Sequence, residues 1–263
     1  MSKILIQTMI LTAIIHIIDT LSYSVRLNSV KSKQYILSTS LFNIFVLFSR
    51  TANTFLSPLI GAIVGLAMAE KINPITEIRL IIFSATIGTI IGTMLIPTFL
   101  KIFSIAVSKL EVSGSIPLLM IKSLSVNNIK KAAQKATLPK KSMITRLSIK
   151  NIPKGLLLIN TFITGIYTIG ILASFYAALF VSPEKRLAVS ASSGMVNGVA
   201  TILLTIFVDP KAAIITEQSI KGERGYQDVK TLTILLMGSK LLGTIIGQLL
   251  LLPSVRFLAW IYS

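Results

Sequence analysis

Tyr35 to Ala69 reads YILSTSLFNIFVLFSRTANTFLSPLIGAIVGLAMA, and this stretch decides the fold. It contains a single formal charge, Arg50. As one helix it would be about 50 Å long, well beyond the ~30 Å hydrocarbon core of a bilayer. We therefore predict a membrane span that is kinked, or turned back as a half-helix, at Ser57-Pro58, because proline removes a backbone donor from a helix.

The composition of the whole chain agrees with a membrane location. Of 263 residues, 53% are hydrophobic and 13% are charged. Several apolar runs reach the roughly 20 residues that a helix needs to cross a bilayer, and the alternation typical of outer-membrane barrel strands is absent. We predict an all-α polytopic membrane protein with about six transmembrane helices. The predicted spans are Ile4–Leu21, Tyr35–Leu56, Ile78–Phe103, Gly155–Val181, Leu187–Val208 and Thr231–Leu252.

Positive charge orients the predicted bundle. The formal net charge is +17, and eleven of the 26 Lys and Arg residues lie in Lys101–Lys154 beside one acid, Glu111. Cytoplasmic loops next to membrane spans carry such an excess. Six alternating spans then place eighteen basic residues inside and six outside, which predicts a cytoplasmic loop 104–154 and both termini outside. We expect this loop to contact anionic lipid head groups, and we expect no nucleic acid partner.

The chain repeats part of its own sequence. GTIIG occurs at Gly88–Gly92 and again at Gly243–Gly247, and such small-xxx-small spacing lets helices approach closely. Ser38–Asn43 (STSLFN) loosely matches Ser192–Asn197 (SSGMVN). Two three-span halves separated by a long cytoplasmic loop have opposite orientations, which predicts two inverted three-helix repeats with substrate near the midplane. Chance similarity between Gly- and Thr-rich membrane helices is the alternative. The predicted units are residues 1–103, the basic loop 104–154 and residues 155–263.

Arg50 is the residue that gives the strongest indication of function. It lies in the polar cluster Ser49-Arg50-Thr51-Ala52-Asn53, and a guanidinium cannot lose its proton to escape hydrocarbon. It must therefore face a cavity, a partner or an anion. One interpretation is a grip for an anionic group, formed with Ser49, Thr51 and Asn53. The other is a packing arginine that snorkels or pairs with an internal carboxylate.

A polar stripe is predicted on the first span. His16, Asp19, Thr20 and Tyr23 follow i, i+3, i+4, i+7 spacing on one helix face, and Arg26 continues that face. The stripe is open to two roles. Either Asp19 neutralises a buried cation, or a His16–Asp19 pair relays protons in ion coupling, since imidazole titrates near neutral pH.

Lys240 is the second cation predicted at membrane depth. Lys240 and Arg50 are two cations within the predicted spans, and Asp19 is the one carboxylate wholly inside them, so the predicted interior is net positive. This imbalance favours an anionic ligand over internal pairing alone, and it leaves open which cation Asp19 pairs with. The amides that we expect to line the same cavity or to join helices are Asn43, Asn53, Asn160, Asn197 and Gln248.

Enzyme signatures are missing from the sequence. No HExxH helix, CxxC pair, Walker glycine loop or GxSxG turn occurs. The chain has one histidine, no cysteine and no acid-rich cluster that would hold Mg²⁺ on a pyrophosphate. We therefore expect neither a catalytic site nor a metal or cofactor.

Six segments together resemble one known family. They are HIIDTLSYSVR (His16–Arg26), SLFNIFVLFSRTAN (Ser40–Asn53), PLIG (Pro58–Gly61), NGVATILLT (Asn197–Thr205), VDP (Val208–Pro210) and GTIIGQ (Gly243–Gln248). They resemble the Amj family, the alternate lipid II flippases of bacteria, and the resemblance covers nearly the whole chain except Ser104–Lys150. It implies a multi-pass protein of the bacterial inner membrane. Such a protein moves lipid II, an undecaprenyl-pyrophosphate-linked disaccharide-pentapeptide, from the inner to the outer leaflet.

A pyrophosphate fits the predicted interior. Arginine holds phosphate through a bidentate fork and lysine acts as a point charge, so Arg50, Lys240 and Arg26 would bind it. The polar residues expected around them are Ser49, Thr51, Asn53, Asn43, Asn197 and Gln248. We expect alternating access between the inverted halves, with Arg50 at the centre.

Two other functions stay open at this point. An ion-coupled secondary transporter of a small anionic solute would use His16 and Asp19 for coupling, and its cavity would be closed to lipid. A non-transporting membrane assembly factor would have a tightly packed core in which Asp19 fully satisfies Arg50. A cavity that opens sideways to lipid favours the flippase.

Overall fold

A computed structural model describes residues 1–113, 137, 139, 147 and 149–263. These residues form helices without strands, and six helical spans among them are long and apolar enough to cross a membrane. The spans are Ser2–Ser32, Tyr35–Glu70, Ile75–Leu110, Lys154–Phe180, Pro183–Ile220 and Tyr226–Ile261. The predicted all-α fold with six spans is confirmed. Most of loop 104–154, and with it the predicted contact with anionic lipids, lies outside the described residues.

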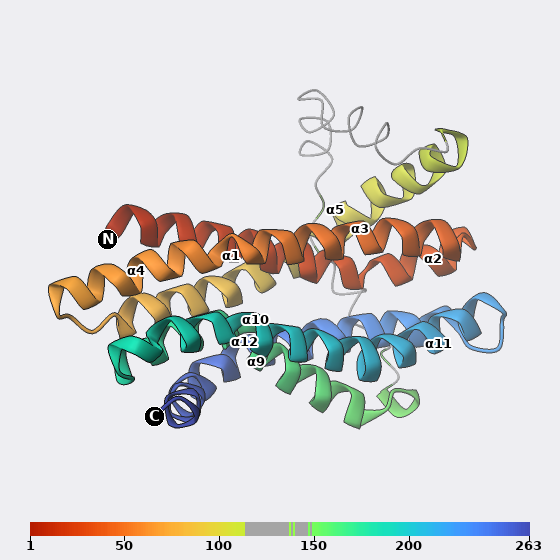
Figure 1. Cartoon of the computed structure of the whole chain (residues 1–263). Coiled ribbons are helices and arrows are strands. Elements are labelled where there is room, and N and C mark those ends of the chain that lie inside the picture. Colours follow the sequence, from red (N-terminus) through yellow and green to blue (C-terminus); the bar gives the residue numbers. More distant parts are fainter. Residues whose placement is uncertain (114–136, 138, 140–146, 148) are drawn as a thin grey trace.

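Each half of the chain supplies three spans. In the first half they are α1 (Ser2–Tyr23) with α2 (Val25–Ser32), α3 (Tyr35–Thr54) with α4 (Leu56–Glu70), and α5 (Ile75–Ser113). In the second half they are α9 (Lys154–Ala177), then α10 (Arg186–Leu203) with the π-helical η4 (Leu204–Val208) and α11 (Asp209–Ile220), and α12 (Tyr226–Ile261). Figure 1 shows both chain termini at one end of the bundle and α2 and α11 at the other. We call the end with the two termini the terminal end and the end with α2 and α11 the basic end. The terminal half and the basic half are the halves of the bundle next to these ends.

Proline explains why the second and fifth spans are each interrupted. Pro58 has no N–H to donate to the Thr54 carbonyl, and α3 ends at Thr54. α4 continues in nearly the same direction, so this span is kinked and does not turn back (Figure 1). In the fifth span Pro210 comes directly after the wider turn of η4, in which the Asp209 N–H donates to the Leu204 carbonyl. The span predicted to end at Val208 therefore runs on into α11.

The two GTIIG motifs pack in matching ways. A Cβ added to Gly88 would lie 2.8 Å from the Cα of Ala13, so α5 lies directly on α1. A Cβ added to Gly243 would lie 2.5 Å from the carbonyl oxygen of Thr161, so α12 lies directly on α9. Each motif thus packs the third span of a half against the first span of the same half.

Apolar side chains fill the terminal half of the bundle. One cluster joins residues of α1, α4, α5, α9, α10 and α12, among them Ile15, Ile63 and Leu172. Toward the basic end, α5 continues beyond Phe103, where its span was predicted to end. Phe103, with Val107 and Leu110 on the same helix face, is buried in a second cluster with α2 and α3.

Candidate functional site

A cavity of about 240 Å³ lies between the two halves, in the basic half of the bundle. α1, α2 and α3 line it from the first half, and α9, α10, η4, the first residue of α11 and α12 from the second. The predicted site residues in its wall are His16, Asp19, Tyr23, Arg26, Asn43, Arg50 and Lys240. Residues from both halves and from five of the six spans therefore meet at one place.

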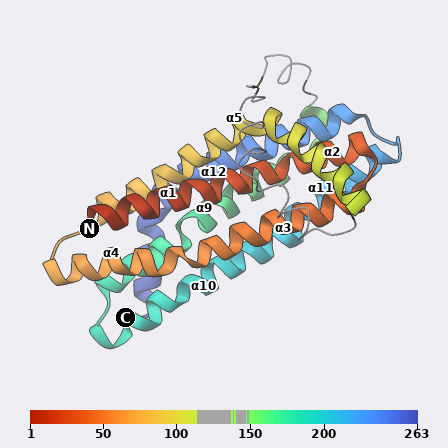
Figure 2. The same ribbon diagram turned by 90° about the horizontal axis from the view of Figure 1, so that it is seen from above.

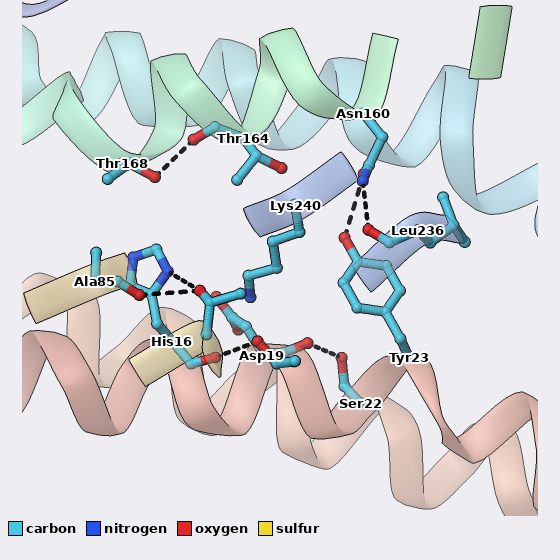
Figure 3. Close-up of polar contacts among 12 residues, drawn as sticks. His16, Asp19, Ser22, Tyr23, Ala85, Asn160, Thr164, Thr168, Leu236 and Lys240 are labelled. Carbon is cyan, nitrogen blue, oxygen red and sulfur yellow. Dashed lines mark hydrogen bonds and ion pairs between the residues drawn. The ribbon is translucent and has the colours of Figure 1, made fainter. Parts of the chain in front are cut away.

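Lys240 and Asp19 form an ion pair inside this cavity. The lysine is 3% exposed, and its Nζ lies 3.7 Å from Asp19 Oδ2 (Figure 3). The same Nζ lies 5.8 Å from the centre of the Tyr23 ring, which adds a cation–π contact. Of the two cations that Asp19 was predicted to neutralise, the structure selects Lys240.

Asn160 joins three helices beside this pair. Tyr23 Oη donates a hydrogen bond to Asn160 Oδ1 at 3.2 Å, and Asn160 Nδ2 donates to the Leu236 carbonyl at 3.1 Å and to Ser239 Oγ at 2.7 Å (Figure 3). These bonds tie α1 to α9 and α9 to α12. Asn160 therefore has the helix-joining role, and it holds the Tyr23 ring in place below Lys240.

Arg26 forms the second ion pair of the cavity. Its Nη2 lies 3.1 Å from Asp209 Oδ1, which links α2 to α11 near the basic end. The guanidinium also lies 5.4 Å from the centre of the Phe42 ring, which holds it against α3. Its Nη1 is buried without a hydrogen-bond partner. One donor of Arg26 is therefore free to bind a further acceptor.

Arg50 differs from the other two cations of the cavity. Its side chain is exposed on α3, and among the described residues it forms no ion pair. The cavity holds three cations, Arg50, Arg26 and Lys240, against two carboxylates. Since both carboxylates are engaged elsewhere, Arg50 carries the charge that the protein leaves unbalanced.

The cavity opens sideways between α3 and the α10–η4 segment. Asn43, Arg50 and Thr205 line it and are also exposed, so they mark its mouth. α3 packs against α1, α2, α4 and α5, while α10 packs against α9 and its own flanking turns, and the two helices run side by side (Figure 2). Leu47 is 64% and Met195 71% exposed on these two helices. The mouth therefore opens between apolar surfaces that a bilayer would cover with lipid.

The sequence neighbours of Arg50 do not share its position. Ser49 is 1% exposed and its Oγ has no hydrogen-bond partner, while Thr51 is exposed outside the cavity wall. Asn53 lines a second cavity of about 20 Å³ on the side of the terminal end. His16 and Tyr167 line both cavities, so they form the wall between the two.

Two further predicted residues lie outside the larger cavity. Asn197 is 9% exposed and packs against Gly170 of α9, and its Oδ1 has no hydrogen-bond partner. Gln248 Nε2 donates a hydrogen bond to the Arg79 carbonyl at 2.9 Å, which joins α12 to α5. The binding roles proposed for these two amides stay predictions.

Sequence reasoning missed several residues of the cavity wall. Thr164 and Tyr167 of α9 line it, three residues apart on an apolar helix, and this is the spacing that had identified His16 and Asp19. Asp209 also lines it, directly after Val208, where the fifth span was predicted to end. The same search for polar residues at helical spacing would have found the first two.

Comparison with known proteins identifies a family and a similar protein of named function. The family described as "Amj: Alternate to MurJ" matches residues 11–262. The "Lipid II flippase Amj" of Bacillus subtilis (strain 168) is 36% identical over 250 residues, which are 94% of this chain and 93% of that protein. No solved structure matches the chain.

Proposed function

The chain belongs to the Amj family, as its six segments predicted, and we propose that it moves lipid II from the inner to the outer leaflet of the bacterial inner membrane. It is a multi-pass transporter and not an enzyme. The structural observation that carries the mechanism is the laterally open cavity whose unpaired cation is Arg50.

The cavity suits the charged part of such a substrate. Arg50 can hold a phosphate through two parallel hydrogen bonds, and Lys240, whose Nζ lies 3.7 Å from Asp19 Oδ2, can exchange that carboxylate for a phosphate oxygen. A volume of about 240 Å³ is below the roughly 300–1,000 Å³ of sites that enclose drug-sized ligands. It therefore takes the pyrophosphate and the adjoining part of the first sugar. The remaining head group and the prenyl chain would extend through the mouth between α3 and α10.

Orientation and alternating access complete the proposal. The eighteen-to-six distribution of basic residues supports a cytoplasmic basic end and an outside terminal end. In this orientation the cavity faces the inner leaflet, and the apolar cluster of the terminal half closes the outer side. Matched packing of α5 on α1 and of α12 on α9 supports two inverted halves that rock against each other.

The other two functions receive less support. His16 Nδ1 lies 3.5 Å from Thr89 Oγ1, and Asp19 is engaged by Lys240, so these residues are held by other partners and not as a proton-relaying pair. A packed assembly factor would have had Arg50 satisfied by Asp19. The open mouth and the free Arg50 favour the flippase.

Replacing Arg50 tests this proposal. In cells depleted of other lipid II flippases, we expect Arg50→Ala to abolish growth, and Arg50→Lys to retain part of it. A charge-assisted hydrogen bond contributes about 1.5–3 kcal/mol, which is roughly a 10- to 100-fold loss of binding. Lipid II exposed on the outer leaflet is measured alongside growth, at matched protein abundance. Arg256→Ala, an exposed arginine of α12 outside the cavity, is the control. Normal growth and normal lipid II exposure with Arg50→Ala would refute the central role.

A further inference from the structure

The close contacts of the glycine motifs place α1 and α9 in one register. Gly88 and Gly92 of α5 lie against α1, and Gly243 and Gly247 of α12 lie against α9. The residues that correspond through these contacts are Ala13 with Thr161, Ile17 with Gly165, and Thr20 with Thr168. Their separation in residue number is the same in all three pairs. The first span of each half is therefore matched residue by residue.

The second and fifth spans also correspond. The segments STSLFN and SSGMVN align Asn43 with Asn197. The same alignment sets Phe55, the break between α3 and α4, opposite Asp209, where α11 begins after η4. The second and fifth spans are therefore interrupted at aligned positions. The prolines beside these interruptions, Pro58 and Pro210, do not align with each other.

Two matched pairs of positions are packed differently in the two halves. By these registers Ser22 corresponds to Gly170, and Asn43 to Asn197. Ser22 and Asn43 both line the open cavity of the basic half. In the terminal half the counterparts touch, since a Cβ added to Gly170 would lie 3.1 Å from Asn197 Cγ. The same positions are thus open in one half and closed in the other.

We propose that the Gly170–Asn197 contact is the closed outward mouth of the transport path, through which the polar head group leaves. The proposal rests on the function proposed above. Asn197 is 9% exposed and its Oδ1 has no hydrogen-bond partner, so this acceptor can be satisfied by a donor from outside the protein. When α10 moves away from α9, this amide is exposed to the head group as Asn43 is now.

The outward mouth is chemically unlike the inward one. The residues that correspond to the five charged groups of the inward cavity are all neutral: Tyr167 for Asp19, Ser174 for Arg26, Leu204 for Arg50, Phe55 for Asp209 and Ala85 for Lys240. The outward mouth therefore offers neutral amide and hydroxyl groups, which suit the saccharide and peptide. It lacks the cations that hold a pyrophosphate. Binding of the anionic group is thus strong on the inner side and weak on the outer side.

Cysteine pairs test the outward mouth, because the chain has no cysteine of its own. The variant Gly170→Cys, Asn197→Cys should form a disulfide on mild oxidation of membranes, because a Cβ at position 170 would lie 3.1 Å from Asn197 Cγ, the position that a cysteine sulfur would take. The matched variant Ser22→Cys, Asn43→Cys should not. We expect oxidation of the first variant to reduce lipid II transport at least tenfold and a reductant to restore it. Equal transport by the oxidised and reduced protein would overturn the proposal.

A labelling measurement keeps the test independent of folding defects in the double variant. Asn197→Cys alone should react slowly with a membrane-impermeant maleimide from the outside. It should react several-fold faster when a short bifunctional thiol reagent first closes Ser22→Cys and Asn43→Cys in the same chain. No increase would overturn the proposal. If labelling increases while the unmodified chain moves no lipid II, the outward mouth is retained and the lipid II assignment falls.

Discussion

The Lys240–Asp19 pair allows stability and substrate binding to be measured apart. Lys240 Nζ lies 3.7 Å from Asp19 Oδ2, and the two side chains are 4% and 24% exposed. In the empty cavity the lysine neutralises Asp19, and in the proposed loaded state it binds the pyrophosphate. Lys240→Gln should therefore harm both states, whereas Lys240→Gln combined with Asp19→Asn should harm only the loaded one.

The geometry sets the expected size of the effect. At an effective dielectric constant of about 20, two unit charges 3.7 Å apart attract by about 4.5 kcal/mol. Desolvation of the lysine offsets part of this attraction, and loss of one partner of a buried pair costs about 3–5 kcal/mol. Water still reaches Asp19, so we expect Lys240→Gln to lower the free energy of unfolding by about 2–3 kcal/mol. The double variant removes both charges and should regain most of that loss.

The assay is a double-mutant cycle with two readouts. Thermal unfolding of the purified protein measures stability, and exposure of lipid II on the outer leaflet measures transport. We expect the double variant to unfold near the wild-type temperature and to transport at least tenfold more slowly. Wild-type transport by the double variant would show that Lys240 does not bind substrate. A double variant as unstable as Lys240→Gln would show that the two charges are not coupled.

Two further predictions concern helix packing and the second ion pair. Gly243→Ala places a methyl group 2.5 Å from the Thr161 carbonyl oxygen and should lower the free energy of unfolding by about 1–3 kcal/mol. Gly238→Ala meets open space and should not lower it. Thermal unfolding measures both variants, and equal shifts in unfolding temperature would contradict the packing. Asp209→Asn frees Arg26 from its carboxylate and should tighten binding of inorganic pyrophosphate about threefold to tenfold, while Arg26→Gln should weaken it by a similar factor. Titration calorimetry measures both, and weaker binding by Asp209→Asn would contradict this role.

The sequence predicts the spans because a bilayer imposes a length on every helix that crosses it. It leaves the partner of Asp19 open because Arg50 and Lys240 lie on different spans, and only the packing of those spans decides which cation comes near α1. That packing depends on the glycines of α5 and α12, which bring each helix to its partner at backbone distance. The sequence identifies these glycines, but the rotation of α12 that points Lys240 at α1 is a property of the assembled bundle.

Helix geometry explains which neighbours of Arg50 reach the cavity. Successive residues of an α-helix are rotated by about 100°, so Ser49 and Thr51 point away from the face that carries Arg50. Val46 and Asn43 lie four and seven residues earlier, on the same face, and both line the cavity. The prediction grouped Arg50 with its sequence neighbours, and of the amides expected beside it only Asn43 lines the same cavity; the binding roles of Ser49 and Thr51 stay predictions.

The two halves of the proposed repeat have matching packing residues but different charges. This difference affects which state of the protein binds the substrate more tightly. Matched glycine contacts pack the first and third spans of each half in the same way, so the two halves of the empty protein can move against each other as similar units. Charges confined to the inward cavity favour the inward-facing state when a pyrophosphate is bound. They cannot drive net transport, because the protein returns to its starting state after each cycle. Net movement must therefore come from a difference in lipid II concentration between the leaflets, or from the membrane potential acting on its charge, which contributes about 2.3 kcal/mol per charge for each 100 mV.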